Sequence, residues 1–196
     1  MDRRRLILGL SALATPVAAQ ESWQARLVAA AEGQVGKTLT YDPAYTRLSY
    51  PNGDVPLARG VCTDVVIRAY RTAFGLDLQQ LVHEDMAANF ARYPKLWGLK
   101  RTDRNIDHRR VPNLETFLNR RGASLPLSPT PAALQAGDLV TQRLPGNLPH
   151  ILIVHRRRQS GRPLAVHNIG QGARLEDALF DHPIVGWFRF APPARG

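Results

Sequence analysis

Cysteine is almost missing from this chain: Cys62 is the single one among 196 residues. One cysteine cannot form an intramolecular disulfide, and it cannot build a zinc site made of several thiolates. It stands at the head of an apolar, helix-like run over residues 61–70. A lone thiol is a liability in an oxidising compartment unless it is buried or takes part in chemistry. Cys62 is therefore the first candidate for a functional residue.

Acidic residues are also scarce, with 16 Asp and Glu against 26 Lys and Arg, for a formal net charge of +10. Such a balance favours polyanionic partners: nucleic acid, anionic lipid or an acidic cell envelope. Aromatic residues make up only 7% of the chain and are not interleaved with basic residues into a stripe. Nucleic-acid binding is therefore not expected. The arginines are scattered, which is also typical of an ordinary solvated surface.

Long hydrophobic runs are absent, because the longest, residues 6–17, is too short to span a bilayer comfortably. A basic stretch precedes it, and small residues at 17–19 follow it, as in a cleavable secretory signal. We expect residues 1–19 to be a signal peptide and the protein to reach the periplasm or the exterior. Residues 3–7 also loosely match a twin-arginine signal, although Asp2 departs from that pattern. Both export routes stay open, and no integral membrane segment is expected after signal removal.

The remaining chain, residues 20–196, has the length and composition of one globular domain. Helical spacing of apolar residues predicts four helices, near 22–36, 62–74, 79–93 and 113–121. After Gly137 the period changes to two, which predicts strands at 138–142, 150–156, 163–168 and 184–190. Short loops make neighbouring strands antiparallel. The sequence thus predicts an α+β fold, with the helix that begins at Cys62 packed on a C-terminal antiparallel meander.

Two histidines lie on neighbouring predicted strands. His150 opens the second strand, while His155 lies five residues on and points to the other face. If the third strand pairs with the second, His167 lies beside His150 and can orient its imidazole; Asn168 is the competing orienter if a bulge turns the strand. A helix N-terminus and a nearby imidazolium both lower the pKa of a thiol. Cys62, His150 and His167 are therefore predicted to form a catalytic site.

Other polar residues carry weaker signals. His83, His108 and His182 lack metal-ligand spacing, so neither a metal nor a cofactor is expected. Asp64 is an acid/base candidate, but a carboxylate near a helix start more often stabilises the helix dipole. The segment 170–172 is read as a flexible tip without the spacing of a phosphate-binding loop.

Short segments around these residues resemble the NlpC-type cell-wall cysteine peptidases. The likeness lies in four segments, which are GVCTDVV at 60–66, GDLV at 137–140, PHILIV at 149–154 and VHN at 166–168. A more specific likeness covers almost the whole mature chain. It is to an uncharacterised family of exported bacterial proteins in that superfamily, domain-of-unknown-function family 1287, with matching segments at 41–45, 60–70 and 105–113.

The resemblance implies a papain-like core in which Cys62 is the nucleophile, His150 the base and His167 the orienter. Tyr41 would correspond to the superfamily's tyrosine near the thiol. The chain departs from the pattern in two places. Thr63 and Asp64 replace the usual Ser-Gly after the cysteine, and residues 79–131 form a long insert between the helix and the sheet.

The function expected on these grounds is that of an exported thiol hydrolase. It would cleave an amide bond in peptidoglycan, either within the stem peptide or at its junction with the sugar. The positive surface would hold the protein on this anionic envelope polymer. Two alternatives stay open: a non-catalytic envelope-binding module on the same scaffold, with the insert as its grip, and a Cys-dependent acyl or amide transferase. The sequence makes no prediction of the oligomeric state.

Overall fold

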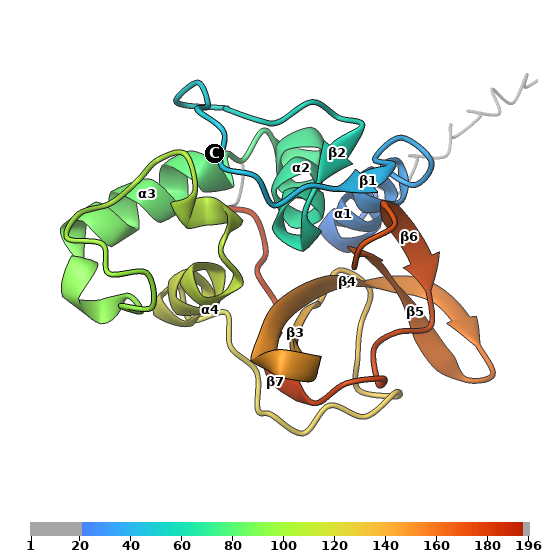
Figure 1. Cartoon of the computed structure of the whole chain (residues 1–196). Coiled ribbons are helices and arrows are strands. Elements are labelled where there is room, and N and C mark those ends of the chain that lie inside the picture. Colours follow the sequence, from blue (N-terminus) through green and yellow to red (C-terminus); the bar gives the residue numbers. More distant parts are fainter. Residues whose placement is uncertain (1–20, 194–196) are drawn as a thin grey trace, which may run out of the picture.

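The computed structural model describes residues 21–193, so the expected signal peptide at 1–19 lies outside the described residues. Helices fill the first part of the chain and a sheet the second (Figure 1). The helices are α1 (Trp23–Glu32), α2 (Cys62–Phe74), α3 (Leu78–Ala88) and α4 (Val111–Arg120), with 3-10 turns η1 (Phe90–Arg92), η2 (Asp107–Arg109) and η3 (Pro145–Asn147). The strands are β1 (Thr40–Tyr41), β2 (Arg59–Gly60), β3 (Leu139–Leu144), β4 (Leu148–Gln159), β5 (Arg162–Asn168), β6 (Ala173–Glu176) and β7 (Ile184–Phe188). The α+β class is confirmed.

Helix α2 begins and ends where the sequence predicts. The Asp64 side chain accepts the backbone N–H of Val61 at 2.7 Å, which satisfies one of the free amides of the first turn. Gly75 ends the helix with φ 68°, a left-handed conformation that glycine adopts at little cost. Most of α2 is buried between these ends, because apolar side chains cover much of its circumference. Among the described residues, no helix is both long and apolar enough to cross a membrane.

The main sheet has five antiparallel strands in the order β6-β5-β4-β3-β7. Strands β3 to β6 form a meander, as expected for β3, β4 and β5. Strand β7 does not extend that meander but returns to pair with the free edge of β3, where Leu139 lies opposite Phe188. Strand β6 was not predicted, because it is only four residues long and follows the glycine-containing segment 170–172 that was read as a tip. Strands β1 and β2 pair separately and in parallel.

Both faces of the sheet are covered. One face packs with residues of α1, α2 and α4 and contributes Leu139, Ile151, Ile153, Val166 and Phe188. The other face carries a smaller core of Val140, Leu152, Val154, Ala165 and Trp187, closed by Leu134 and Leu179 from connecting segments. By strand alternation His150 belongs to this second face, whereas α2 lies over the first. The side chain of His150 can therefore meet Cys62 only where β4 begins, at the end of the sheet.

The insert between α2 and β3 packs against the rest of the chain through a buried ion pair. Arg109 in η2 binds Asp64 in the first turn of α2, with Nη2 to Oδ2 at 2.9 Å. Both side chains are almost completely buried, 2% and 3% exposed. Figure 1 shows α3 and α4 beside the sheet and α2.

Candidate active site

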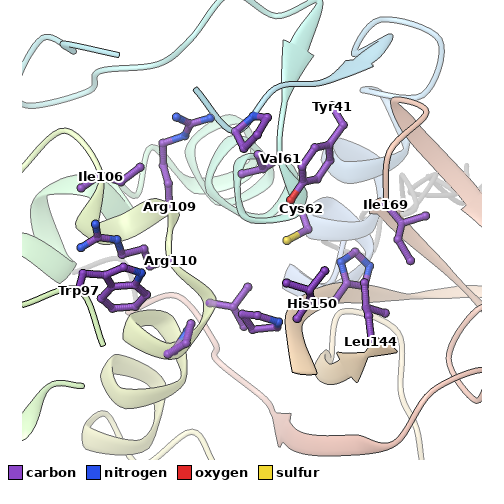
Figure 2. A pocket seen from close by; sticks show the side chains of 15 residues that line it. Tyr41, Val61, Cys62, Trp97, Ile106, Arg109, Arg110, Leu144, His150 and Ile169 are labelled. Carbon is purple, nitrogen blue, oxygen red and sulfur yellow. The ribbon is translucent and has the colours of Figure 1, made fainter. Parts of the chain in front are cut away.

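A pocket of about 350 Å³ opens between the start of α2, the start of β4 and the insert. Cys62 and His150 line its inner part, and Tyr41 lies beside them (Figure 2). Trp97 and Arg110, both from the insert, line the far side. Its size falls in the usual range for small-ligand sites, about 300–1,000 Å³.

Cys62 is the first residue of α2 and is 4% exposed. Burial raises the pKa of its thiol to about 11, and the nearby charge of Asp64 adds to this effect. Hydrogen bonding from the backbone of Ile151, the residue after His150, acts in the opposite direction and lowers the pKa of the thiol. The sequence predicts a lowered pKa from the helix N-terminus, and this prediction is wrong, because desolvation outweighs the helix. At neutral pH the sulfur carries its proton.

His150 heads a chain of hydrogen bonds that crosses the sheet. Its Nε2 lies 2.8 Å from Nδ1 of His167. The Nε2 of His167 lies 2.9 Å from Oε1 of Glu176 on β6. Because a carboxylate only accepts, His167 carries its proton on Nε2 and receives the Nε2 proton of His150 on Nδ1. That assignment leaves Nδ1 of His150 unprotonated and able to accept a proton.

Both imidazoles are neutral at physiological pH. Burial, together with charge repulsion from His167 and His182, lowers the pKa of His150 to about 3. Burial also lowers the pKa of His167, although the charge of Glu176 opposes that shift. The resting site therefore pairs a neutral thiol with a neutral imidazole base. Proton transfer between them belongs to the reaction itself.

Tyr41 reaches the site through the small parallel pair. Strand β1 aligns Tyr41 with Gly60, two residues before Cys62, which brings a residue distant in sequence beside the thiol. Its hydroxyl points toward the sulfur (Figure 2). Burial, together with the charges of Cys62 and Asp64, raises the pKa of Tyr41 to about 12. Tyr41 therefore keeps its proton and can act as a hydrogen-bond donor.

The other two accessory candidates, Asp64 and Asn168, hold the surrounding structure in place through hydrogen bonds. Both carboxylate oxygens of Asp64 accept hydrogen bonds, from the backbone N–H of Val61 and from Arg109. Asp64 is therefore not a free acid or base for catalysis. The side chain of Asn168 donates to the backbone oxygen of Gly60 at 2.9 Å and makes no hydrogen bond to a histidine. His167, not Asn168, contacts the imidazole of His150. Asn168 instead holds the segment that leads into Cys62.

His155 and His108 lie away from the site, whereas His182 is near enough to His150 to act on its pKa. His155 bonds Glu32 of α1 at 3.2 Å, on the side away from His150, as strand alternation predicts. His108 is buried in the insert, where burial lowers its pKa to about 4. Within residues 21–193, no group of three or more His, Cys, Asp or Glu side chains could hold a metal ion.

Sequence reasoning missed Glu176, Arg110 and Trp97. Glu176 could have been found only from β6, where pairing places Arg174 opposite His167 and Glu176 two residues further along. Arg110 and Trp97 lie in the insert, and their place in the pocket depends on how the insert packs.

Comparison with known proteins finds a close relative in Escherichia coli. The protein described as "Uncharacterized protein YijF" of Escherichia coli (strain K12) is 53% identical over 177 residues, covering 90% of this chain and 86% of the relative. Residues 28–190 match the family described as "Domain of unknown function (DUF1287)". This match runs from α1 through the last strand and includes each residue of the site described above. The chain therefore belongs to the DUF1287 family.

Proposed function

We propose that this protein is an exported, NlpC-type thiol hydrolase with a papain-like core that cleaves an amide bond in peptidoglycan. One observation carries the proposal. Cys62, at the start of a buried helix, shares a pocket with His150, whose far nitrogen is held by a chain through His167 to Glu176. A nucleophile, a base and an orienting group in this order are the parts that acyl transfer requires.

In the first step the sulfur of Cys62 attacks the carbonyl carbon of the amide, and its proton passes to Nδ1 of His150. The imidazolium that forms on His150 is stabilised by its hydrogen bond to His167. His167 in turn is hydrogen-bonded to the negatively charged carboxylate of Glu176. His150 then gives the proton to the leaving amine, the C–N bond breaks, and a thioester remains on Cys62. Water, activated by the same imidazole, hydrolyses the thioester and restores the thiol.

The negative oxygen of the tetrahedral intermediate needs hydrogen-bond donors. The backbone N–H of Cys62 lies in the first turn of α2, where amides have no partner within the helix. The Tyr41 hydroxyl, kept protonated by its raised pKa, points toward the Cys62 side chain. We assign these two groups to the oxyanion. The net charge of +10 and the secretory pattern at the N-terminus support an anionic envelope polymer as the substrate.

A non-catalytic envelope-binding module is the second candidate. The observation in its favour is the thiol itself, which is 4% exposed and has its pKa raised to about 11. A thiol that never ionises would have no catalytic role, and the protein would then act only by binding the envelope through its basic surface.

Incubation of the mature protein with purified sacculi tests the proposal. We expect soluble peptide fragments to be released, with one new amine and one new carboxylate for each cut. Since Cys62 is the single cysteine, iodoacetamide modifies one known site, and release should fall in proportion to the alkylated fraction. Capture of the acyl group by an added amine, with little hydrolysis, would indicate a transferase. Salt-sensitive binding to sacculi with no release would contradict the hydrolase and support the binding module.

A further inference from the structure

Arg110 places a cation on the far side of the pocket from His150. It directly precedes α4, and its guanidinium lies over the ring of Trp97, with Cζ 4.0 Å from the ring centroid. Figure 2 shows this stack across the pocket from His150. Trp97 is 37% exposed, so the stack is open to the pocket and not enclosed in the core. An aromatic face holds a guanidinium in one orientation, ready for a planar anion.

The charge of Arg110 is not fully compensated. Within residues 21–193 its guanidinium makes no hydrogen bond, and its one ionic contact is Oδ1 of Asp107, at 3.5 Å. Neighbouring Arg109 differs, because Asp64 and the backbone oxygen of Asp42 already take up its donors. Burial lowers the pKa of Arg110, as expected for a cation that has lost water without gaining an equivalent partner.

The described carboxylates that act on Arg110 lie outside the pocket lining: Asp107, whose Oδ1 is 3.5 Å from Nη1, and Asp103. Within residues 21–193, no aspartate or glutamate lines the pocket itself. Most of the lining is apolar, with Val61, Ile106, Val111, Leu144, Leu148 and Ile169. A charge-assisted hydrogen bond to Arg110 gains strength in such surroundings, because the local dielectric is low. The N-terminus of α4, adjacent to Arg110 and also lining the pocket, adds positive potential.

We propose that Arg110, held on Trp97, binds a free carboxylate of the substrate while Cys62 acts on an amide of the same molecule. This rests on the proposed function and narrows its substrate class. The substrate is a peptide segment that carries a free carboxylate near the cleaved bond. The carboxylate binds at Arg110 and the amide at Cys62, so the two groups are separated by the length of this one pocket. A neutral peptide of the same shape, or one whose carboxylates are amidated, is a poor substrate. Arg110 is then a specificity-determining residue with no part in bond breaking.

Binding can be measured without turnover. The ligands are soluble peptide–sugar fragments made by digesting sacculi with a glycan-cleaving enzyme, and the same fragments after carbodiimide coupling of their carboxylates to ammonia. Isothermal titration calorimetry with Cys62→Ala protein should show the untreated fragments binding about 10- to 100-fold more tightly than the amidated ones. Arg110→Gln in the same background should reduce this preference to within about threefold.

Arg156→Gln is the matched control, because Arg156 is an exposed arginine on β4 that does not line the pocket, and its loss changes the net charge equally. It should keep the preference. Equal binding of both ligands, no measurable binding of the untreated fragments, or an Arg110→Gln protein that keeps the preference would each overturn the inference. The comparison of ligands uses unaltered Arg110, so it holds even if Arg110→Gln protein fails to fold.

Different results would reject the hydrolase and the carboxylate site at Arg110. A wild-type protein that cuts sacculi but accepts amidated fragments equally well leaves the hydrolase standing and rejects the carboxylate site. A protein that cuts nothing, yet binds only fragments with free carboxylates and loses this preference with Arg110→Gln, keeps the site and rejects the hydrolase.

Discussion

Replacing Cys62 by alanine is expected to abolish release of peptide fragments from sacculi, with kcat/KM falling on the order of 10⁴- to 10⁶-fold. The reason is that the sulfur forms the bond to the acyl group, and no other side chain of the pocket can take its place. Tyr41 keeps its proton, and the two arginines in the lining do not act as nucleophiles. The rate is measured as new amine groups per unit time at substrate concentrations well below saturation.

Cys62→Ser protein separates chemistry from packing. Serine keeps the size and a hydrogen-bonding group, but its hydroxyl ionises far less readily than a thiol, so this variant should also be inactive. Both variants should unfold within a few degrees of wild type, because only one small buried atom changes. Residual activity within tenfold of wild type in either variant would remove Cys62 from the mechanism.

Replacing Asp64 by alanine is expected to lower the free energy of unfolding by about 3–5 kcal/mol. The change leaves the guanidinium of Arg109, 2% exposed, buried without its charge partner. It also removes the acceptor for the backbone N–H of Val61, which precedes the nucleophile. Since native domains are stable by only about 5–15 kcal/mol, this is a large share of the total. Urea unfolding followed by circular dichroism measures it.

Asp177→Ala is the matched control for this variant. Asp177 pairs with Arg162 at 3.1 Å, but the two side chains are 26% and 39% exposed, so water compensates for the lost contact. The expected change in the free energy of unfolding is below about 1 kcal/mol. If Asp64→Ala costs no more than this control, the ion pair does not anchor the insert to α2. Asp64 would then need another role.

Much of the fold could be predicted because its signals are local. Helix α2 is marked by a run of apolar residues and by Gly75, which stops it. Successive side chains of a strand point to opposite faces of the sheet, and this alternation separates His150 from His155 on β4. The contact of 2.8 Å between His150 and His167 follows from the same alternation together with antiparallel pairing.

What could not be predicted depends on contacts between distant segments. Strand β6 has four residues and little periodicity, so Glu176 gave no sign of its place beside His167. Arg110 is one of many arginines in the sequence, and only its stacking on the Trp97 ring distinguishes it. The pKa of Cys62 was predicted in the wrong direction, because a helix N-terminus can be read from sequence while the depth of burial cannot.

Mass spectrometry of the protein, quenched in acid while it digests soluble fragments of sacculi, detects the acyl-enzyme itself. We expect a covalent acyl fragment on the tryptic peptide that contains Cys62, removed when hydroxylamine cleaves the thioester. We expect no such fragment in Cys62→Ala protein. Continued release of fragments with the acyl group found on another residue, or never found on Cys62, would contradict this mechanism.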